Sequence, residues 1–241
     1  MRSIRLSVGT AIGSAALLFG AAVPSAAAAP PVQPGSPITM GGSYCTLNWI
    51  YDGTGSRDGV VYAGTAGHCV NRTGQAVHLA DAALGDPIQK IGRVAYINKK
   101  LDTALIKLNS AARAQAKPAM AGHPNIPTGV ATAKETNLGD VCQFSGHGVG
   151  FHATEVTQQR RVGVLASNNG KQHYCDGAVT PGDSGGPVGD VTAGNQALGI
   201  VNTVGVYTDG DIPAAGEGGV SMPAFLADAR AHGFPVKLRT V

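Results

Sequence analysis

The apolar residues of this chain occur in short runs separated by turn residues, with Val, Ile and Thr recurring in the runs. Glycine is abundant, at 35 of 241 residues, and marks many of the connections. A first cluster of runs covers 44–51, 59–65, 75–79, 88–97 and 103–108, and a second covers 140–144, 154–159, 161–167, 178–179, 186–188 and 197–203. The pattern predicts an all-β protein.

The stretch between the two clusters, 109–131, shows no strand alternation and contains three prolines, so we interpret it as a linker. One convincing helix lies near the end, in AFLADARAHG, where Leu226 and Ala229 lie three residues apart and Gly233 provides a stop signal. This outline is compatible with two packed barrels whose seam holds a site. Strand counting alone does not distinguish it from a single sandwich.

The N-terminal segment has the order of a secretory signal peptide: Arg2 and Arg5, an apolar run over 11–23, and then small residues. A membrane anchor is the alternative, but the run is short and is interrupted by Gly and Ser. We expect residues 1–29 to be removed and 30–40, rich in Pro, Gly and Ser, to form a flexible arm. No later apolar run is long enough to cross a bilayer, so the mature chain is expected to be secreted, without membrane contact.

Charge and cysteine content exclude several classes of site. The net charge is only +3, and no basic block interleaved with aromatic residues is present, so we expect no nucleic-acid partner. Four cysteines, without a C-x-x-C pair, favour two disulfides over a metal site. His147 and His152 lie close in sequence but lack a third nearby ligand. We therefore expect no metal and no cofactor.

Ser184 lies in TPGDSGGPV, a stretch whose composition fits an ordinary surface turn as well as a nucleophile loop. A nucleophilic serine needs a base, and a carboxylate to orient that base. His68 ends an apolar strand in AGTAGHC, although with seven histidines in the chain a structural role is the ordinary expectation. Its neighbour Cys69 has a natural disulfide partner in Cys45, one strand earlier, closing a loop of about 25 residues. Such a bridge would fix the backbone that aims the imidazole.

The candidate carboxylate is Asp102, at the head of the apolar strand LDTALIKL. A buried carboxylate is costly unless it is paired, and a histidine N–H is a suitable partner. Taken alone, Asp102 is more simply explained as a residue that caps the strand in solvent. Cys142 and Cys175 remain to pair with each other by elimination.

The motifs TAGHC, DTALIKL and GDSGGP, in this order, resemble those of the chymotrypsin-like (trypsin-like) serine endopeptidases. The compact spacing and the paired cysteines around 45–69 are most similar to the secreted bacterial branch that includes the streptogrisins. The resemblance extends over about 41–203. It implies two six-stranded antiparallel Greek-key barrels, at 41–108 and 132–241, with the active site in the cleft between them and a short C-terminal helix.

Carried over by position, the resemblance implies that Ser184 is the nucleophile, His68 the general base and then acid, and Asp102 the residue that holds the imidazole tautomer. The backbone N–H groups of Gly182 and Ser184 would form the oxyanion hole. Asp183 is buried in the family and needs a cation. Because no IVGG-like N-terminus is present, Arg160 and Arg161 are the candidates.

The resemblance also bears on specificity. Ala178 occupies the position where trypsin-like members carry an acid, which argues against cleavage after Arg or Lys. Asp176 lies two residues earlier and is more simply a turn residue. Pro181 and the segment Asn202, Thr203 and Val204 would contact substrate, the segment pairing with it as an added strand. Val204 lies where a glycine often keeps the pocket open, so we expect a preference for small or medium apolar residues.

The sequence thus predicts a secreted, monomeric serine endopeptidase acting on polypeptides, with a protein protease inhibitor as a further candidate partner. One alternative is a catalytically silent protease-like binding protein, although such proteins usually lose a triad residue or an oxyanion glycine, and none is lost here. A second alternative, a secreted esterase of the α/β-hydrolase type, fails because GDSGGP leads into a strand rather than a helix and the order of the three residues differs.

Overall fold

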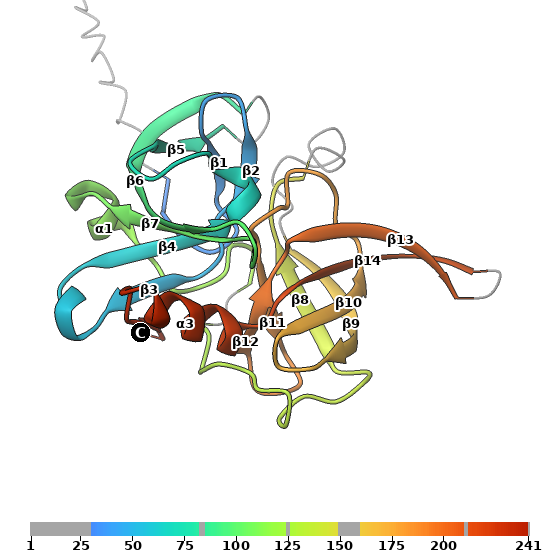
Figure 1. Ribbon diagram of the computed structural model, residues 1–241. Helices are drawn as coiled ribbons and strands as arrows, with labels where there is room; N and C mark the ends of the chain where they lie inside the picture. The colour runs from blue at the N-terminus through green and yellow to red at the C-terminus, as the bar shows by residue number, and fades with distance from the viewer. Residues whose placement is uncertain (1–29, 82–84, 124–125, 149–159, 210–211, 241) are drawn as a thin grey trace, which may run out of the picture.

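The computed structural model describes residues 30–81, 85–123, 126–148, 160–209 and 212–240, which form two curled antiparallel sheets (Figure 1). The first sheet has the order β15-β3-β4-β7-β6-β5-β1-β2. Its strands are β1 (Pro37–Thr39), β2 (Tyr44–Thr46), β3 (Ile50–Gly53), β4 (Val61–Ala66), β5 (Ala76–Ala80), β6 (Pro87–Asn98), β7 (Thr103–Leu108) and β15 (Val236–Leu238).

The second sheet has the order β12-β11-β8-β9-β10-β14-β13. Its strands are β8 (Val141–Ser145), β9 (Arg160–Asn168), β10 (Gln172–Gly177), β11 (Pro187–Asp190), β12 (Gln196–Ile200), β13 (Thr203–Asp209) and β14 (Ile212–Val220). The all-β, two-part prediction is confirmed. The described residues form sheets of eight and seven strands, however, rather than six each.

Helical structure is sparse. The described helices are α1 (Ser110–Gln115), in the segment between the sheets, α3 (Met222–Ala231), and the short 3-10 turns η1 (Gly55–Arg57) and η2 (Gly67–Cys69). The predicted terminal helix therefore exists as α3, starting two residues earlier than AFLADARAHG. In the described part of the chain no helix has the length and apolar character needed to cross a membrane.

The segment 30–40, expected to be a flexible arm, is instead part of the first sheet. Val32 is fully buried, donating its N–H to the carbonyl of Gln115 and accepting from the N–H of Lys117. β1 pairs with β2 and β5, and Ile38 and Met40 lie in the core. The Pro-rich composition concealed this role, because three apolar side chains spaced through an extended segment bury enough surface to hold it. Residues 1–29 lie outside the described part.

The C-terminal residues return to the first sheet. The segment 132–241, predicted to form the second barrel, therefore contributes to both sheets. After α3, β15 pairs with β3. α3 packs with the residues that join the two sheets, a cluster that includes Trp49, Tyr51, Tyr62, Ile200, Val220, Met222 and Phe225. The Trp49 indole N–H also donates to the Gly199 carbonyl of the second sheet at 3.0 Å. The two sheets are thereby packed against each other through a continuous apolar core.

Candidate active site

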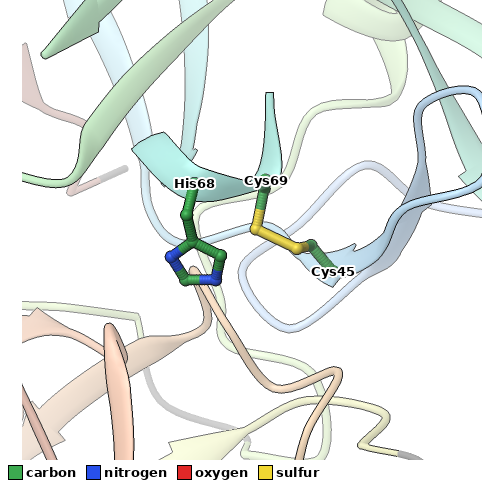
Figure 2. Close-up of side chains that lie close together, drawn as sticks. All are labelled: Cys45, His68 and Cys69. Carbon is green, nitrogen blue, oxygen red and sulfur yellow. A yellow bond between two sulfur atoms is a disulfide. The ribbon is translucent and has the colours of Figure 1, made fainter. Parts of the chain in front are cut away.

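His68 lies in η2, the turn that follows β4, beside the disulfide between Cys69 and Cys45 (Figure 2). The predicted pairing of these two cysteines is therefore confirmed. The donor atoms of Cys45, His68 and Cys69 lie within 4.8 Å of one another, but a metal needs thiolates, and both sulfurs are already joined in the disulfide. The group therefore does not fit a metal site, and its role is to anchor the turn that carries the imidazole.

Asp102 lies in the turn between β6 and β7 and receives two hydrogen bonds from His68. The His68 amide donates to Asp102 Oδ1 at 2.6 Å, and ring Nδ1 lies 2.8 Å from Oδ2. Asp102 has a φ of 56°, a left-handed conformation that short polar residues tolerate best. Gly67 is required opposite it, because a Cβ there would lie 2.8 Å from the Thr103 nitrogen. The two turns therefore meet backbone to backbone.

The surroundings favour the ionised form of Asp102. Partial burial alone would raise its pKa, but hydrogen bonds from the His68 ring and amide, the charge of His68, and the Asn202 side chain together hold the pKa below its usual range. Asn202 Nδ2 donates to the Asp102 carbonyl at 2.7 Å and to Oδ2 at 3.0 Å. With Nδ1–H facing this carboxylate, the assigned tautomer leaves Nε2 of the half-exposed His68 ring free as a base.

The loop that carries Ser184 is fixed to both sheets through its backbone. The Ser184 carbonyl accepts from the Thr46 N–H at 2.9 Å, and the Gly185 N–H donates to the Val201 carbonyl at 2.7 Å. Gly185 has a φ of 85°, and a Cβ there would lie 2.6 Å from the Ala66 nitrogen, just before η2. Only glycine fits so close to the end of β4. The loop is thereby pressed against the strand that leads to His68.

Two N–H groups of this loop differ from their neighbours. The amides of Asp183, Gly185 and Gly186 each donate to a backbone carbonyl. Among the hydrogen bonds of the described residues, the amides of Gly182 and Ser184 donate to none. Gly182 has a φ of 105°, which again favours glycine. These two donors lie within three residues of the same loop, and backbone amides without a partner are suited to hold an oxyanion.

Comparison with known families decides the identity of the chain. A family model described as Trypsin matches residues 54–216, more than half of the sequence. The chain belongs to the trypsin family. Its members are serine endopeptidases, so the chain is assigned to that class of hydrolase. The curated proteins provide no match.

Solved structures of bacterial trypsin-family proteases share the fold. Thermobifida fusca protease A covers 87% of this chain and 100% of its own, at 20% identity and a TM-score of 0.61. Cellulomonas bogoriensis chymotrypsin covers 87% and 99%, at 19% identity and a TM-score of 0.58. A glutamic acid-specific serine protease covers 86% and 100%, at 20% identity and 0.58. At these identities the likeness establishes the chymotrypsin-like fold.

Within this trypsin-family chain, the cation for Asp183 is Arg161 rather than Arg160. The guanidinium lies 2.5 Å from one carboxylate oxygen and 2.8 Å from the other, with both side chains buried. Asp183 also accepts from the amides of Gly148 and Thr180, each at 2.8 Å. A bidentate pair with additional amide donors satisfies a buried carboxylate. The loop ahead of Ser184 is held from inside the second sheet.

The residues predicted to contact substrate lie between β10 and β11 and at or just before the start of β13. Ala178 and Pro181 are exposed, as are Thr203 and Val204 at the start of β13. The side chain of Asn202 donates to Asp102, and its Oδ1 accepts from the Val220 N–H at 2.8 Å. The expected pairing of the Asn202 backbone with substrate stays a prediction. A cleft of about 160 Å³ is lined in part by Asp102, Tyr174, Asn202 and Thr203. Ala178, Pro181 and Val204 are not among its lining residues.

Three further predictions concern the Ser184 hydroxyl, the second disulfide, and the segment that contains His147 and His152. Within the described residues, no hydrogen bond joins the Ser184 hydroxyl to His68. The disulfide between Cys142 and Cys175 is confirmed. His147 is buried, while His152 and the strand expected at 154–159 lie outside the described residues.

Sequence reasoning missed a second histidine–carboxylate pair. His173 on β10 and Glu217 on β14 are fully buried, with Nε2 2.9 Å from Oε1. None of their four polar side-chain atoms makes a contact with full hydrogen-bond geometry in the described structure, so the two groups are a close pair by distance only. Burial raises the pKa of Glu217, although the neighbouring His173 opposes the shift. Nothing in the strand pattern distinguished these two residues from solvent-facing ones.

Proposed function

We propose that this chain is a secreted serine endopeptidase that hydrolyses polypeptides through an acyl-enzyme, with His68, Asp102 and Ser184 as the triad. The observation that carries the proposal is the His68–Asp102 pair, with Nδ1 bound and Nε2 free. The Ser184 loop approaches the end of β4, just before His68, so closely that only glycine fits at position 185, and this supports the same proposal. The family membership and two disulfides are in keeping with an exported hydrolase.

The proposed reaction has two halves. The Ser184 oxygen attacks the scissile carbonyl carbon while His68 Nε2 takes the hydroxyl proton, and the carbonyl oxygen becomes an oxyanion held by the amides of Gly182 and Ser184. The C–N bond then breaks, and Nε2 delivers its proton to the leaving amine. Water repeats the steps on the ester, releasing the acid and restoring Ser184. Asp102 stabilises the imidazolium without taking its proton.

The substrate is proposed to lie along Thr203 and Val204, adding a strand next to β13. Val204 is exposed, and position 178 carries alanine rather than an acidic residue. Both observations support a preference for small or medium apolar residues before the cleaved bond. A Val204→Gly variant should shift cleavage toward larger residues, roughly tenfold in relative kcat/KM, because one or two methylenes are worth about 1–3 kcal/mol in such pockets. An unchanged cleavage pattern in a peptide library would reject this pocket.

The test of the function uses purified mature protein and its Ser184→Ala variant, each treated with a fluorophosphonate probe and then with unfolded casein. We expect only the wild type to be labelled and to cut casein. Folded wild-type protein that neither reacts nor cuts would favour the alternative, a protease-like binding protein. The remaining proposals, export through residues 1–29, a monomeric state and recognition by protein inhibitors, are separate from this test.

A further inference from the structure

The turn that carries Asp102 is connected to the C-terminal helix through one side chain. Asn98, the last residue of β6, accepts from the N–H groups of Lys100 and Leu101 with its Oδ1, both at 3.0 Å. These two bonds close the turn immediately before Asp102. The amide end of the same side chain, Nδ2, donates to Asp228 Oδ1 on α3 at 2.9 Å.

The carboxylate of Asp228 has a second partner. Its Oδ2 accepts from the Tyr96 hydroxyl at 2.6 Å, and the His232 ring lies nearby, with Nδ1 3.0 Å from the Tyr96 oxygen. Asp228 is mostly buried, with 15% of its side chain exposed, so its contacts are made in a partly desolvated setting. It fixes the direction in which the Asn98 amide points, since only an acceptor satisfies Nδ2 on that side.

The same turn also reaches the His68 turn. Lys99, next to Asn98, donates its ammonium to the carbonyls of Gly67 and Val70, at 2.8 and 2.5 Å. These two carbonyls flank His68 and Cys69. A displacement of residues 98–101 would therefore move both members of the His68–Asp102 pair, which is set by contacts of 2.6 and 2.8 Å.

We propose that Asp228, on the C-terminal helix, is a positioning residue for catalysis that acts through Asn98 to hold the turn of Asp102 in register with His68. This inference rests on the proposed endopeptidase function. Asp228 touches neither substrate nor the reacting atoms, and its contribution is geometric. Misplacement of a catalytic group by an ångström costs on the order of a hundredfold in rate, so a loosened turn should lower kcat more than it changes KM.

The test compares Asp228→Asn with Tyr96→Phe, using kcat and KM on a small ester, the rate of fluorophosphonate labelling, and the melting temperature. Asp228→Asn leaves one acceptor oxygen for the two donors, Asn98 Nδ2 and the Tyr96 hydroxyl, and so weakens the link to Asn98. It should lower kcat and the labelling rate roughly ten- to a hundredfold, with KM nearly unchanged. Tyr96→Phe removes the hydroxyl that donates to the other oxygen of the same carboxylate, and leaves the His232 ring 3.3 Å from Asp228 Oδ1. It should lower the melting temperature while leaving kcat within about twofold.

A swap separates positioning from general loss of packing. In the double variant Asn98→Asp with Asp228→Asn, the carboxylate and amide exchange places, the total charge is unchanged, and residue 98 still accepts from the two turn amides. It should recover most of kcat, whereas each single change should lower it. Arg230→Gln, on the exposed face of α3, is the matched control and should match the wild type.

Several results would overturn the proposal: an unchanged kcat in Asp228→Asn, equal losses of kcat in Asp228→Asn and Tyr96→Phe, or no recovery in the swap. If Asp228→Asn does not fold, Asn98→Ala tests the same link from the other end and should show the loss of kcat. Inactive wild-type protein would instead reject the proposed function, and the two failures are thereby distinguished.

Discussion

Two histidine–carboxylate pairs in this protein have almost the same separation and opposite surroundings. His68 and Asp102 lie 2.8 Å apart with 46% and 27% of their side chains exposed, and His173 and Glu217 lie 2.9 Å apart with no exposed side-chain surface. Asp102 accepts further bonds from a backbone amide and from Asn202, whereas Glu217 has no other partner in the described structure. The pKa of Asp102 is lowered and that of Glu217 is raised.

The difference shows that a short distance between imidazole and carboxylate does not define a catalytic pair. Hydrogen bonds to the charged form keep Asp102 ionised despite burial, so it can stabilise an imidazolium. Glu217 lacks those bonds, and burial favours its proton. Of the two histidines, only His68 has an exposed ring, a free Nε2 and a serine loop nearby. The surroundings therefore support the proposed catalytic role for His68 and Asp102, and a structural role in the second sheet for His173 and Glu217.

The largest expected difference between the pairs is in turnover. Asp102→Asn should lower kcat by about 10⁴, because an asparagine no longer selects the Nδ1–H tautomer. Glu217→Gln should change kcat by less than about tenfold. Ester hydrolysis by folded protein, normalised by circular dichroism, checks both. Losses of similar size would mean that the buried pair takes part in the reaction.

Replacing the basic partner of each buried carboxylate in the second sheet sharpens the comparison. Arg161→Met leaves Asp183 as a buried carboxylate without its cation and should lower the free energy of unfolding by about 3–5 kcal/mol. His173→Leu should cost less, because Glu217 with a raised pKa can remain neutral by keeping its proton. Urea unfolding of both variants at neutral pH measures the difference. A larger loss in His173→Leu would contradict the assigned charge states.

The support that Asn202 gives Asp102 should account for a smaller part of the rate. Asn202→Ala removes both donations to Asp102, and since bonds to charged groups contribute about 1.5–3 kcal/mol, kcat should fall roughly ten- to a hundredfold. Asn109→Ala, which removes the cap of the distant α1, is a control that should lower stability only. A normal kcat in Asn202→Ala would mean that His68 alone holds Asp102.

The smallest expected effect is a difference in how stability depends on pH. The lowered pKa of Asp102 contributes stability above its ordinary value of 3.8, which is lost as pH falls through the folded-state pKa. The raised pKa of Glu217 contributes stability below its ordinary value of 4.5, which is lost as pH rises through the folded-state pKa. Glu217→Gln should therefore flatten the decline above pH 4.5, by at most about 1.4 kcal/mol per pH unit. Unfolding curves that fall equally in both proteins would contradict the raised pKa.

The strand-rich fold and the triad candidates could be predicted from the sequence because both depend on local signals. Alternating apolar runs mark strands, and the glycines around Ser184 are dictated by the φ of Gly182 and the close approach of Gly185 to β4. The pairing of Cys45 and Cys69 was likewise predictable, since only 24 positions separate them. Each of these features depends on residues close together in the chain or on a motif of fixed order.

The features that sequence reasoning missed depend on contacts between distant segments. Val32 is buried by α1, about 80 residues later, and β15 pairs with β3 from the opposite end of the chain. Asn202 meets Asp102 across 100 positions, and Glu217 becomes buried only where β14 lies between β10 and β13. A single polar residue in a strand pattern gives no sign of which partner a distant segment will supply.

The most direct test of the account is to locate the covalent adduct after fluorophosphonate treatment. Intact mass and peptide mapping should place one adduct per chain on Ser184, formed readily by the wild type and slowed by orders of magnitude in His68→Ala. An adduct on another residue, or labelling of Ser184 at the same rate without His68, would contradict the claim that the His68–Asp102 pair activates this serine.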